Sequence, residues 1–214
     1  MITLERLSQS EAKRYLGGDK IELDEKMLRL FESCEKEVIA HARPKYLYKI
    51  IDLPYPGIFA GEDIKNHLSG CAKAALICAT LGSDIDRLIR VSQISDMSRA
   101  VVLDSFASVA IEQVCRQLDD LLAENYPEYF FTFRFSPGYG DYPIELQKTY
   151  LSILDAPRKI GLSTNENYLL TPSKSVTAIA GMSKEPIERK KRGCAVCDMR
   201  GRCQYRRNGE HCGL

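Results

Sequence analysis

Residues 97–122 read MSRAVVLDSFASVAIEQVCRQLDDLL and contain the clearest regular pattern in the chain. Apolar side chains recur there every three or four residues, which predicts a long helix with one buried face. Three of the apolar residues are alanines, so neighbouring elements could pack closely against this helix. The predicted stripe consists of Met97, Ala100, Leu103, Ala107, Ala110, Val114, Leu118 and Leu121.

Shorter patterns on either side predict a mixture of helices and strands. Apolar spacing predicts further helices over 24–42, which Pro44 would end, and over 144–154. Another helix is expected to begin over 84–91. β-Branched and aromatic residues predict strands over 46–53, 73–81, 129–135, 168–170 and 176–182. The alanine content of 73–81 leaves a helix open there. Because strand–helix–strand units do not repeat, we expect an α+β fold with packed helices and a mostly antiparallel, twisted sheet.

The charge of the chain is unevenly distributed. Among 214 residues, 44% are hydrophobic, which excludes wholesale disorder, and the net charge is only +1. Residues 189–207 hold eight basic residues and one acid, a net +7, so the remainder carries −6. We therefore expect a mildly acidic domain over 1–184, followed by a short basic appendage over 185–214.

The sequence shows neither a membrane-spanning run nor an N-terminal signal peptide. No apolar run approaches the roughly 18–20 residues that a membrane span needs. The first residues, MITLERLSQSEAKRYLGG, are too charged for a signal peptide. We therefore expect a cytoplasmic protein with reduced thiols, in which clustered cysteines bind metal or do redox chemistry.

The basic appendage contains four of the eight cysteines, Cys194, Cys197, Cys203 and Cys212. A Cys-x2-Cys pair can present two thiolates from one short loop, and nearby arginines favour the thiolate form. The wide second interval favours an iron–sulfur cluster over structural zinc, although zinc, or free or disulfide-bonded cysteines, stay open. The isolated Cys34, Cys71, Cys78 and Cys115 lie in apolar patterns and are predicted to be core residues.

A second candidate site is the segment RFSPGYGDYP, residues 134–143. A strand would deliver Arg134 at its end, and a Pro-Gly turn would then expose backbone N–H groups and the Tyr139 ring. Arginine can hold a carboxylate with two hydrogen bonds, and free amides can bind carboxylate or ribose oxygens. From the residues alone, a strand end with a tight turn and a packed tyrosine is the favoured interpretation.

Several motifs of self-contained enzymes are missing from the chain. There is no Gly-x-Ser-x-Gly, no phosphate-binding glycine loop and no His-Glu-x-x-His. No pair of carboxylates stands out for acid–base work, and we predict no catalytic residue. The segment YLLTPSKSV, residues 168–176, is typical of a hairpin turn with hydroxyl caps.

Two of these segments together resemble the activation domain of cobalamin-dependent methionine synthase. Arg-x-x-Pro-Gly-Tyr-x-x-x-Pro over 134–143 resembles the signature of that family, and Pro172-Ser173-Lys174-Ser175-Val176 resembles its later Pro-x-x-Ser-Val. The helix before the arginine also resembles that of the family, and the resemblance extends over roughly 75–183. Two features of the family, an N-terminal acid and a later tyrosine-bearing stretch, are not matched.

The resemblance implies that the chain binds S-adenosylmethionine. In the family, the arginine of the motif and the backbone after it hold the methionine carboxylate and amino group, and these roles carry onto Arg134 and Ser136. The tyrosine of the motif corresponds to Tyr139. An acid six residues before the arginine corresponds to Glu128.

The resemblance also implies a role in methionine biosynthesis. In the family, cob(II)alamin is reduced by one electron and remethylated from S-adenosylmethionine. The domain usually forms part of a very long methyltransferase, so the resemblance implies a partner that carries cobalamin, a methionine synthase or another corrinoid protein. The chain would then be a component of that system rather than an enzyme by itself. Metal on the cysteines could deliver the electron or dock a donor such as flavodoxin or ferredoxin.

Two other functions compete with this hypothesis. The +7 stretch could attract phosphates, as in a nucleic-acid-binding module with a zinc-binding tail. Tyr205 is the single aromatic residue there, so nucleic acid is not among the partners that we expect. Alternatively, the domain could have lost its ligand and serve as a scaffold for docking another protein.

Overall fold

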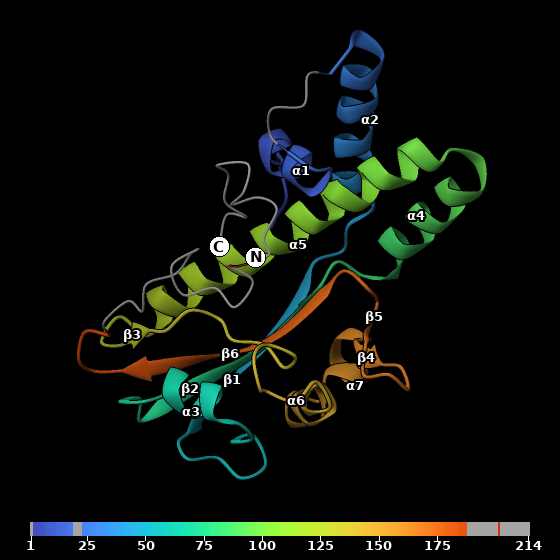
Figure 1. Cartoon of the computed structure of the whole chain (residues 1–214). Helices are drawn as coiled ribbons and strands as arrows, with labels where there is room; N and C mark the ends of the chain where they lie inside the picture. Colours follow the sequence, from blue (N-terminus) through green and yellow to red (C-terminus); the bar gives the residue numbers. More distant parts are fainter. Residues whose placement is uncertain (1, 19–22, 188–200, 202–214) are drawn as a thin grey trace.

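The computed structural model describes residues 2–18, 23–187 and 201, and it confirms the α+β class. A four-stranded antiparallel sheet with the strand order β1-β2-β6-β3 forms the centre of the molecule (Figure 1). A separate pair of short strands, β4 and β5, is also antiparallel. The strands are β1 Lys45–Asp52, β2 Lys73–Thr80, β3 Phe130–Phe131, β4 Ser163–Thr164, β5 Leu170–Thr171 and β6 Ser175–Ser183.

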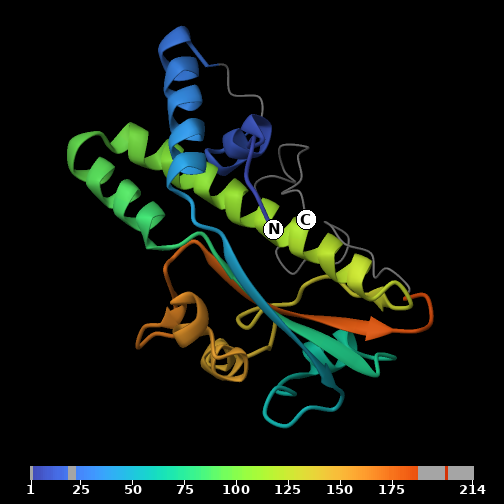
Figure 2. The same cartoon turned by 180° about the vertical axis from the view of Figure 1, so that it is seen from behind.

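Helices cover both faces of the sheet. Helix α5 crosses one face and carries α1 and α2 on its far side, and α4 packs beside its first turns next to the end of the sheet (Figures 1 and 2). Helices α3, α6 and α7 lie on the opposite side of the sheet. The buried apolar clusters follow these layers, with one cluster among the four upper helices and one on each face of the sheet. The helices are α1 Gln9–Tyr15, α2 Glu25–His41, α3 Glu62–His67, α4 Ser83–Ser95, α5 Met97–Asn125, α6 Leu146–Leu154 and α7 Ala156–Ile160.

The position of strand β2 in the sheet explains why its sequence is an unbroken apolar run. Successive side chains of a strand point to opposite faces of the sheet, and here helices cover both faces. Ala75 and Ile77 belong to the cluster under α5, while Leu76 and Cys78 belong to the cluster beside α6. The strand that we predicted over 73–81 is therefore confirmed, and the alternative of a helix is not.

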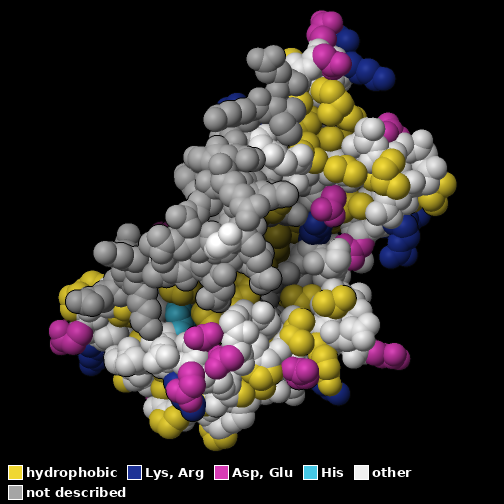
Figure 3. Space-filling model, viewed as in Figure 1, with side chains coloured by type: hydrophobic (Ala, Val, Ile, Leu, Met, Phe, Trp, Pro, Cys, Tyr) yellow, Lys and Arg dark blue, Asp and Glu magenta, His cyan; other side chains and the backbone are white. Residues whose placement is uncertain are grey.

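Helix α5 has the long apolar stripe that its periodicity predicts. The Asp96 carboxylate accepts the N–H of Arg99 at 3.1 Å and caps its start. Most of the stripe is buried, but Met97 is 61% exposed, because it lies at the corner between α4 and α5. Val91, Ile94 and Val101 are also exposed there, and Figure 3 shows apolar side chains gathered over this end of the molecule.

Two expectations about strands are wrong in detail. The run predicted over 129–135 forms only the two residues of β3 and an isolated bridge between Phe135 and Ile179. The segment over 168–176 is not a hairpin, because β5 pairs with β4, whereas β6 pairs with β2 and β3. The Ser173 hydroxyl of this segment instead donates to the carboxylate of Asp86 in α4, at 2.6 Å.

The cysteine-rich appendage lies outside the described residues. Cys194, Cys197, Cys203 and Cys212 all fall there, and the boundary between 184 and 185 stays a prediction. In the described part of the chain, no helix combines the length and apolar character that crossing a membrane requires.

Candidate functional site

Arg134 follows β3 in the chain and lies on a bulge. The Thr132 N–H donates to the Gly181 carbonyl at 2.9 Å, and Phe135 exchanges both backbone hydrogen bonds with Ile179 at 2.9 Å. Two residues of this strand therefore oppose Ala180 alone, which is the pattern of a β-bulge. The Thr132 hydroxyl accepts the Gly181 N–H at 2.8 Å, so a side chain replaces the missing backbone partner.

Arg134 contacts the polar side of α5. Its Nε lies 3.1 Å from Oδ2 of Asp119, and its Nη2 lies 3.2 Å from Oε2 of Glu112. The arginine side chain is 19% exposed, so it stays within reach of a ligand. Burial raises the pKa of the Asp119 carboxyl, and the neighbouring guanidinium limits that rise.

Glu112 and Asp119 are the residues of this cluster that sequence reasoning missed. They stand seven residues apart, close to two turns of an α-helix, and so share one side of α5. The sequence did hold a signal for these two partners of Arg134. Two carboxylates at that spacing lie opposite the apolar stripe of the helix, and the β-prone run that follows the helix contains an arginine.

The loop after Arg134 presents both backbone and side-chain groups. No hydrogen bond from the Ser136 N–H is found within the described residues. Tyr139 is 55% exposed, and its ring meets Phe135 edge-on, with the centroids 5.8 Å apart. The structure thus brings Arg134, Ser136 and Tyr139 into one strand end and turn.

Glu128 lies apart from this loop. It is exposed in the turn between α5 and β3, and in the described chain no hydrogen bond or ion pair joins it to Arg134. Its predicted role at the ligand stays a prediction.

Reciprocal hydrogen bonds clasp the loop to the start of α3. The Asp141 carboxylate accepts the N–H groups of Glu62 at 2.6 Å and Asp63 at 3.0 Å. In return, the Asp63 carboxylate accepts the Asp141 N–H at 3.1 Å. Gly140 lies at a φ of 54°, and a Cβ there would approach Oδ2 of Asp63 to 2.0 Å, so glycine is required at this contact.

The clasp predicts a pH dependence of stability. The two backbone hydrogen bonds hold the pKa of the Asp141 carboxyl below its usual range. Its contribution is therefore complete above the unfolded pKa of about 4 and is lost as pH falls through the lower folded pKa. Thermal unfolding of wild type and Asp141→Asn should show a constant difference above about pH 5 that narrows below about pH 4. A difference that is independent of pH would contradict this assignment.

A wide groove adjoins the arginine cluster through Asp119. It has a volume of about 1370 Å³ and runs between the last turns of α5, strand β3 and the end of α3. Aromatic side chains form much of its wall, including Tyr129, Phe131 and Phe133. His67, 7% exposed, is fixed at its floor by a 2.8 Å hydrogen bond to Thr132. An aromatic groove beside an arginine and two carboxylates could hold a ligand with a flat ring and a charged end.

The segment that resembles Pro-x-x-Ser-Val also reaches α5. Lys174 Nζ lies 2.8 Å from Oδ1 of Asp104 and 3.0 Å from the Ser108 hydroxyl. Its side chain is 14% exposed. Arg134 and Lys174 therefore both bridge from the sheet side to α5 and fix the helix against the sheet.

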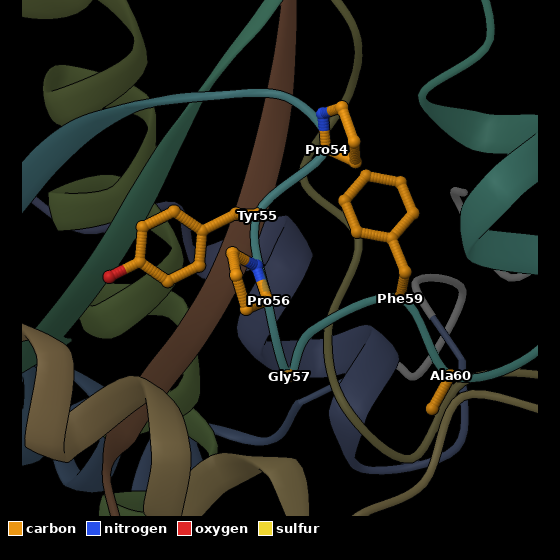
Figure 4. A pocket seen from close by; sticks show the side chains of 6 residues that line it. All are labelled: Pro54, Tyr55, Pro56, Gly57, Phe59 and Ala60. Atoms are coloured by element: carbon orange, nitrogen blue, oxygen red, sulfur yellow. The ribbon is translucent and has the colours of Figure 1, made fainter.

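A second hollow offers no comparable chemistry. It has a volume of about 430 Å³, lies in the loop between β1 and α3, and is shown in Figure 4. The Tyr55 ring points away from the Phe59 ring, and none of the described residues that line the hollow is charged. Its lining residues are Pro54, Tyr55, Pro56, Gly57, Phe59 and Ala60.

Burial raises the pKa of all four isolated cysteine thiols, which disfavours the reactive thiolate form. Cys34, Cys78 and Cys115 are buried as predicted, whereas Cys71 is only half-buried. Burial raises the pKa of the Cys78 and Cys115 thiols to about 12, so neither is a thiolate at neutral pH. Among the described residues, no group of three or more potential ligands could hold a metal ion.

Comparisons with known proteins connect this geometry to a solved structure. No protein-family model matches the chain, and no curated protein matches its sequence. Among solved structures, the chain is similar to the crystal structure of the MetH reactivation domain bound to AdoHcy. The match has a TM-score of 0.56 and 14% sequence identity, and covers 76% of this chain and 67% of that chain. The chain therefore has the fold of the MetH reactivation domain.

Proposed function

We propose that this chain binds S-adenosylmethionine and supports the reductive reactivation of a cobalamin-dependent methyltransferase, with methionine synthase as the first candidate. One observation carries the proposal. Arg134 lies on a bulge, and two residues later the backbone N–H of Ser136 has no partner in the described chain. Support also comes from the fold, since the similar MetH structure was solved with AdoHcy bound.

The chain would contribute binding rather than acid–base chemistry. Arg134 and the Ser136 N–H hold the methionine end, and Tyr139 covers part of the ligand. The cobalamin belongs to the cobalamin-binding domain of the methyltransferase or another corrinoid protein. When bound there, cobalamin would supply a cobalt centre that can take up one electron, from a reductant of the flavodoxin or ferredoxin class, and a methyl group. Arg134, the Ser136 N–H and Tyr139 would hold S-adenosylmethionine as the source of that methyl group, and the sulfur would keep the bonding electron pair.

Calorimetry with S-adenosylmethionine tests the binding step. Arg134→Ala removes charge-assisted hydrogen bonds to the ligand carboxylate, which contribute about 1.5–3 kcal/mol, so affinity should fall roughly 10- to 100-fold. Arg158→Ala is the matched control, because Arg158 forms an exposed ion pair with Asp155 on α7. Absence of binding to wild type, or equal binding by Arg134→Ala, would contradict the proposal.

The second part of the proposal concerns Cys194, Cys197, Cys203 and Cys212. These four thiolates would hold an iron–sulfur cluster, which would supply the reducing electron, and zinc is the alternative occupant. Support comes from the uneven spacing of the cysteines and their basic surroundings. Anaerobic purification followed by optical and EPR spectra should reveal the cluster. A colourless protein with stoichiometric zinc would refute the electron-transfer role.

A further inference from the structure

The charges around Arg134 do not cancel. One guanidinium is paired with two carboxylates, at 3.1 Å from Asp119 and 3.2 Å from Glu112, so the three side chains carry a net charge of −1. Their exposed fractions are 19% for Arg134, 39% for Glu112 and 43% for Asp119. The cluster is therefore partly shielded from solvent, and the excess negative charge acts on whatever binds beside it.

The cluster has both donors and acceptors left for a ligand. A guanidinium has five N–H donors, and the two ion pairs use one on Nε and one on Nη2. The Cys115 side chain is a further hydrogen-bond partner of Arg134, so two donors remain for a carboxylate, while each acid keeps a second oxygen that can accept from an ammonium group. Adjacent donors and acceptors of this kind match the zwitterionic end of an amino acid.

The net charge separates two ligands that are otherwise closely similar. S-adenosylmethionine carries a carboxylate, an ammonium and a sulfonium, a net +1. S-adenosylhomocysteine lacks the methyl group, its sulfur is a neutral thioether, and its net charge is zero. We propose that Glu112 and Asp119 are specificity-determining residues that make the site prefer the cationic methyl donor over its neutral product. This inference rests on the proposed binding of S-adenosylmethionine at Arg134.

The preference would favour turnover of the site. Once the methyl group has left, the attraction between the sulfonium and the carboxylates disappears, and the product is held less tightly than the donor. Because all three side chains are partly exposed, screening limits the effect to about a five- to tenfold difference in affinity. The same screening should reduce the difference as ionic strength rises.

Three ligands and two variants separate charge from shape. Calorimetry of the full chain at low salt would use S-adenosylmethionine, S-adenosylhomocysteine and sinefungin, an analogue that replaces the S-methyl centre by a carbon bearing an ammonium group. Glu112→Gln removes one negative charge but keeps the size and an acceptor for Arg134. Glu124→Gln, at an exposed position of the same helix, is the matched control.

The expected result is that the two cationic ligands bind wild type and Glu124→Gln about five- to tenfold more tightly than S-adenosylhomocysteine. In Glu112→Gln that ratio should fall to about two, because the cluster then has no net charge. Equal affinities for all three ligands, or an unchanged ratio in Glu112→Gln, would overturn the inference while leaving the proposed function intact. No binding of any of the three would overturn both.

Discussion

Replacement of Tyr142 by alanine is expected to lower the free energy of unfolding by about 3–5 kcal/mol, as for other large buried aromatic side chains. Tyr142 is 1% exposed and lies in the cluster beside α6. Its hydroxyl donates to the Ile58 carbonyl at 3.0 Å and lies 2.8 Å from the Tyr150 hydroxyl. Truncation leaves a cavity and unsatisfied buried polar groups. For a chain of this size, the midpoint of thermal unfolding should fall by roughly 6–20 °C.

Tyr142 also anchors the loop that holds Ser136 and Tyr139. Its carbonyl accepts the Gly138 N–H at 2.8 Å, and its N–H donates to the Tyr139 carbonyl at 2.9 Å. Tyr142→Ala keeps these backbone hydrogen bonds but removes the buried ring and the hydroxyl that fix this end of the loop in the core. The loop should then be held less firmly, so binding of S-adenosylmethionine should weaken even at temperatures where the variant stays folded.

Tyr139→Ala is the matched control in the same loop. Its ring is 55% exposed, so we expect a change in stability within about 0.5 kcal/mol, together with weaker ligand binding. Thermal unfolding and calorimetry of both variants distinguish the two tyrosines. A stable Tyr142→Ala variant, or a strongly destabilised Tyr139→Ala variant, would contradict the assignment of anchor and exposed ring.

Elements with many regular positions could be predicted from the sequence. The spacing of apolar residues was sufficient for α5 and α2, and the unbroken run at 73–81 indicated a strand that is buried on both faces. In contrast, β3 stops after Phe131 because the Thr132 hydroxyl takes the Gly181 N–H, a contact between residues far apart in sequence. Such a contact has no local signal, so periodicity alone extended the strand to residue 135.

The candidate site shows the same division. Arg134 and its loop are a contiguous motif, and the sequence predicted that they lie together. Their partners Glu112 and Asp119 come from another element, and the clasp joins Asp141 to an α3 residue 78 positions away, Asp63. Counting charged residues predicted only the net negative charge of the domain. The fold places two of the acidic side chains around a single arginine.

Replacement of Phe106 by alanine should destabilise the chain as strongly as Tyr142→Ala, by about 3–5 kcal/mol, yet spare the site. Phe106 is fully buried in α5 and meets Phe31 of α2 edge-on, with the ring centroids 5.4 Å apart. Val101→Ala is the control on the same helix, because Val101 is 47% exposed and its truncation should cost less than about 0.5 kcal/mol.

The affinity of Phe106→Ala for S-adenosylmethionine, measured well below its midpoint of thermal unfolding, should match that of wild type. Glu112 lies six residues further along α5, about 9 Å along the helix axis, and Arg134 and Lys174 still fix that part of the helix to the sheet. Loss of binding in the folded variant would mean that the packing of α2 on α5 controls the geometry around Arg134. Unchanged binding with a large loss of stability would show that the ion pairs from the sheet side are sufficient to hold α5 in register with the loop.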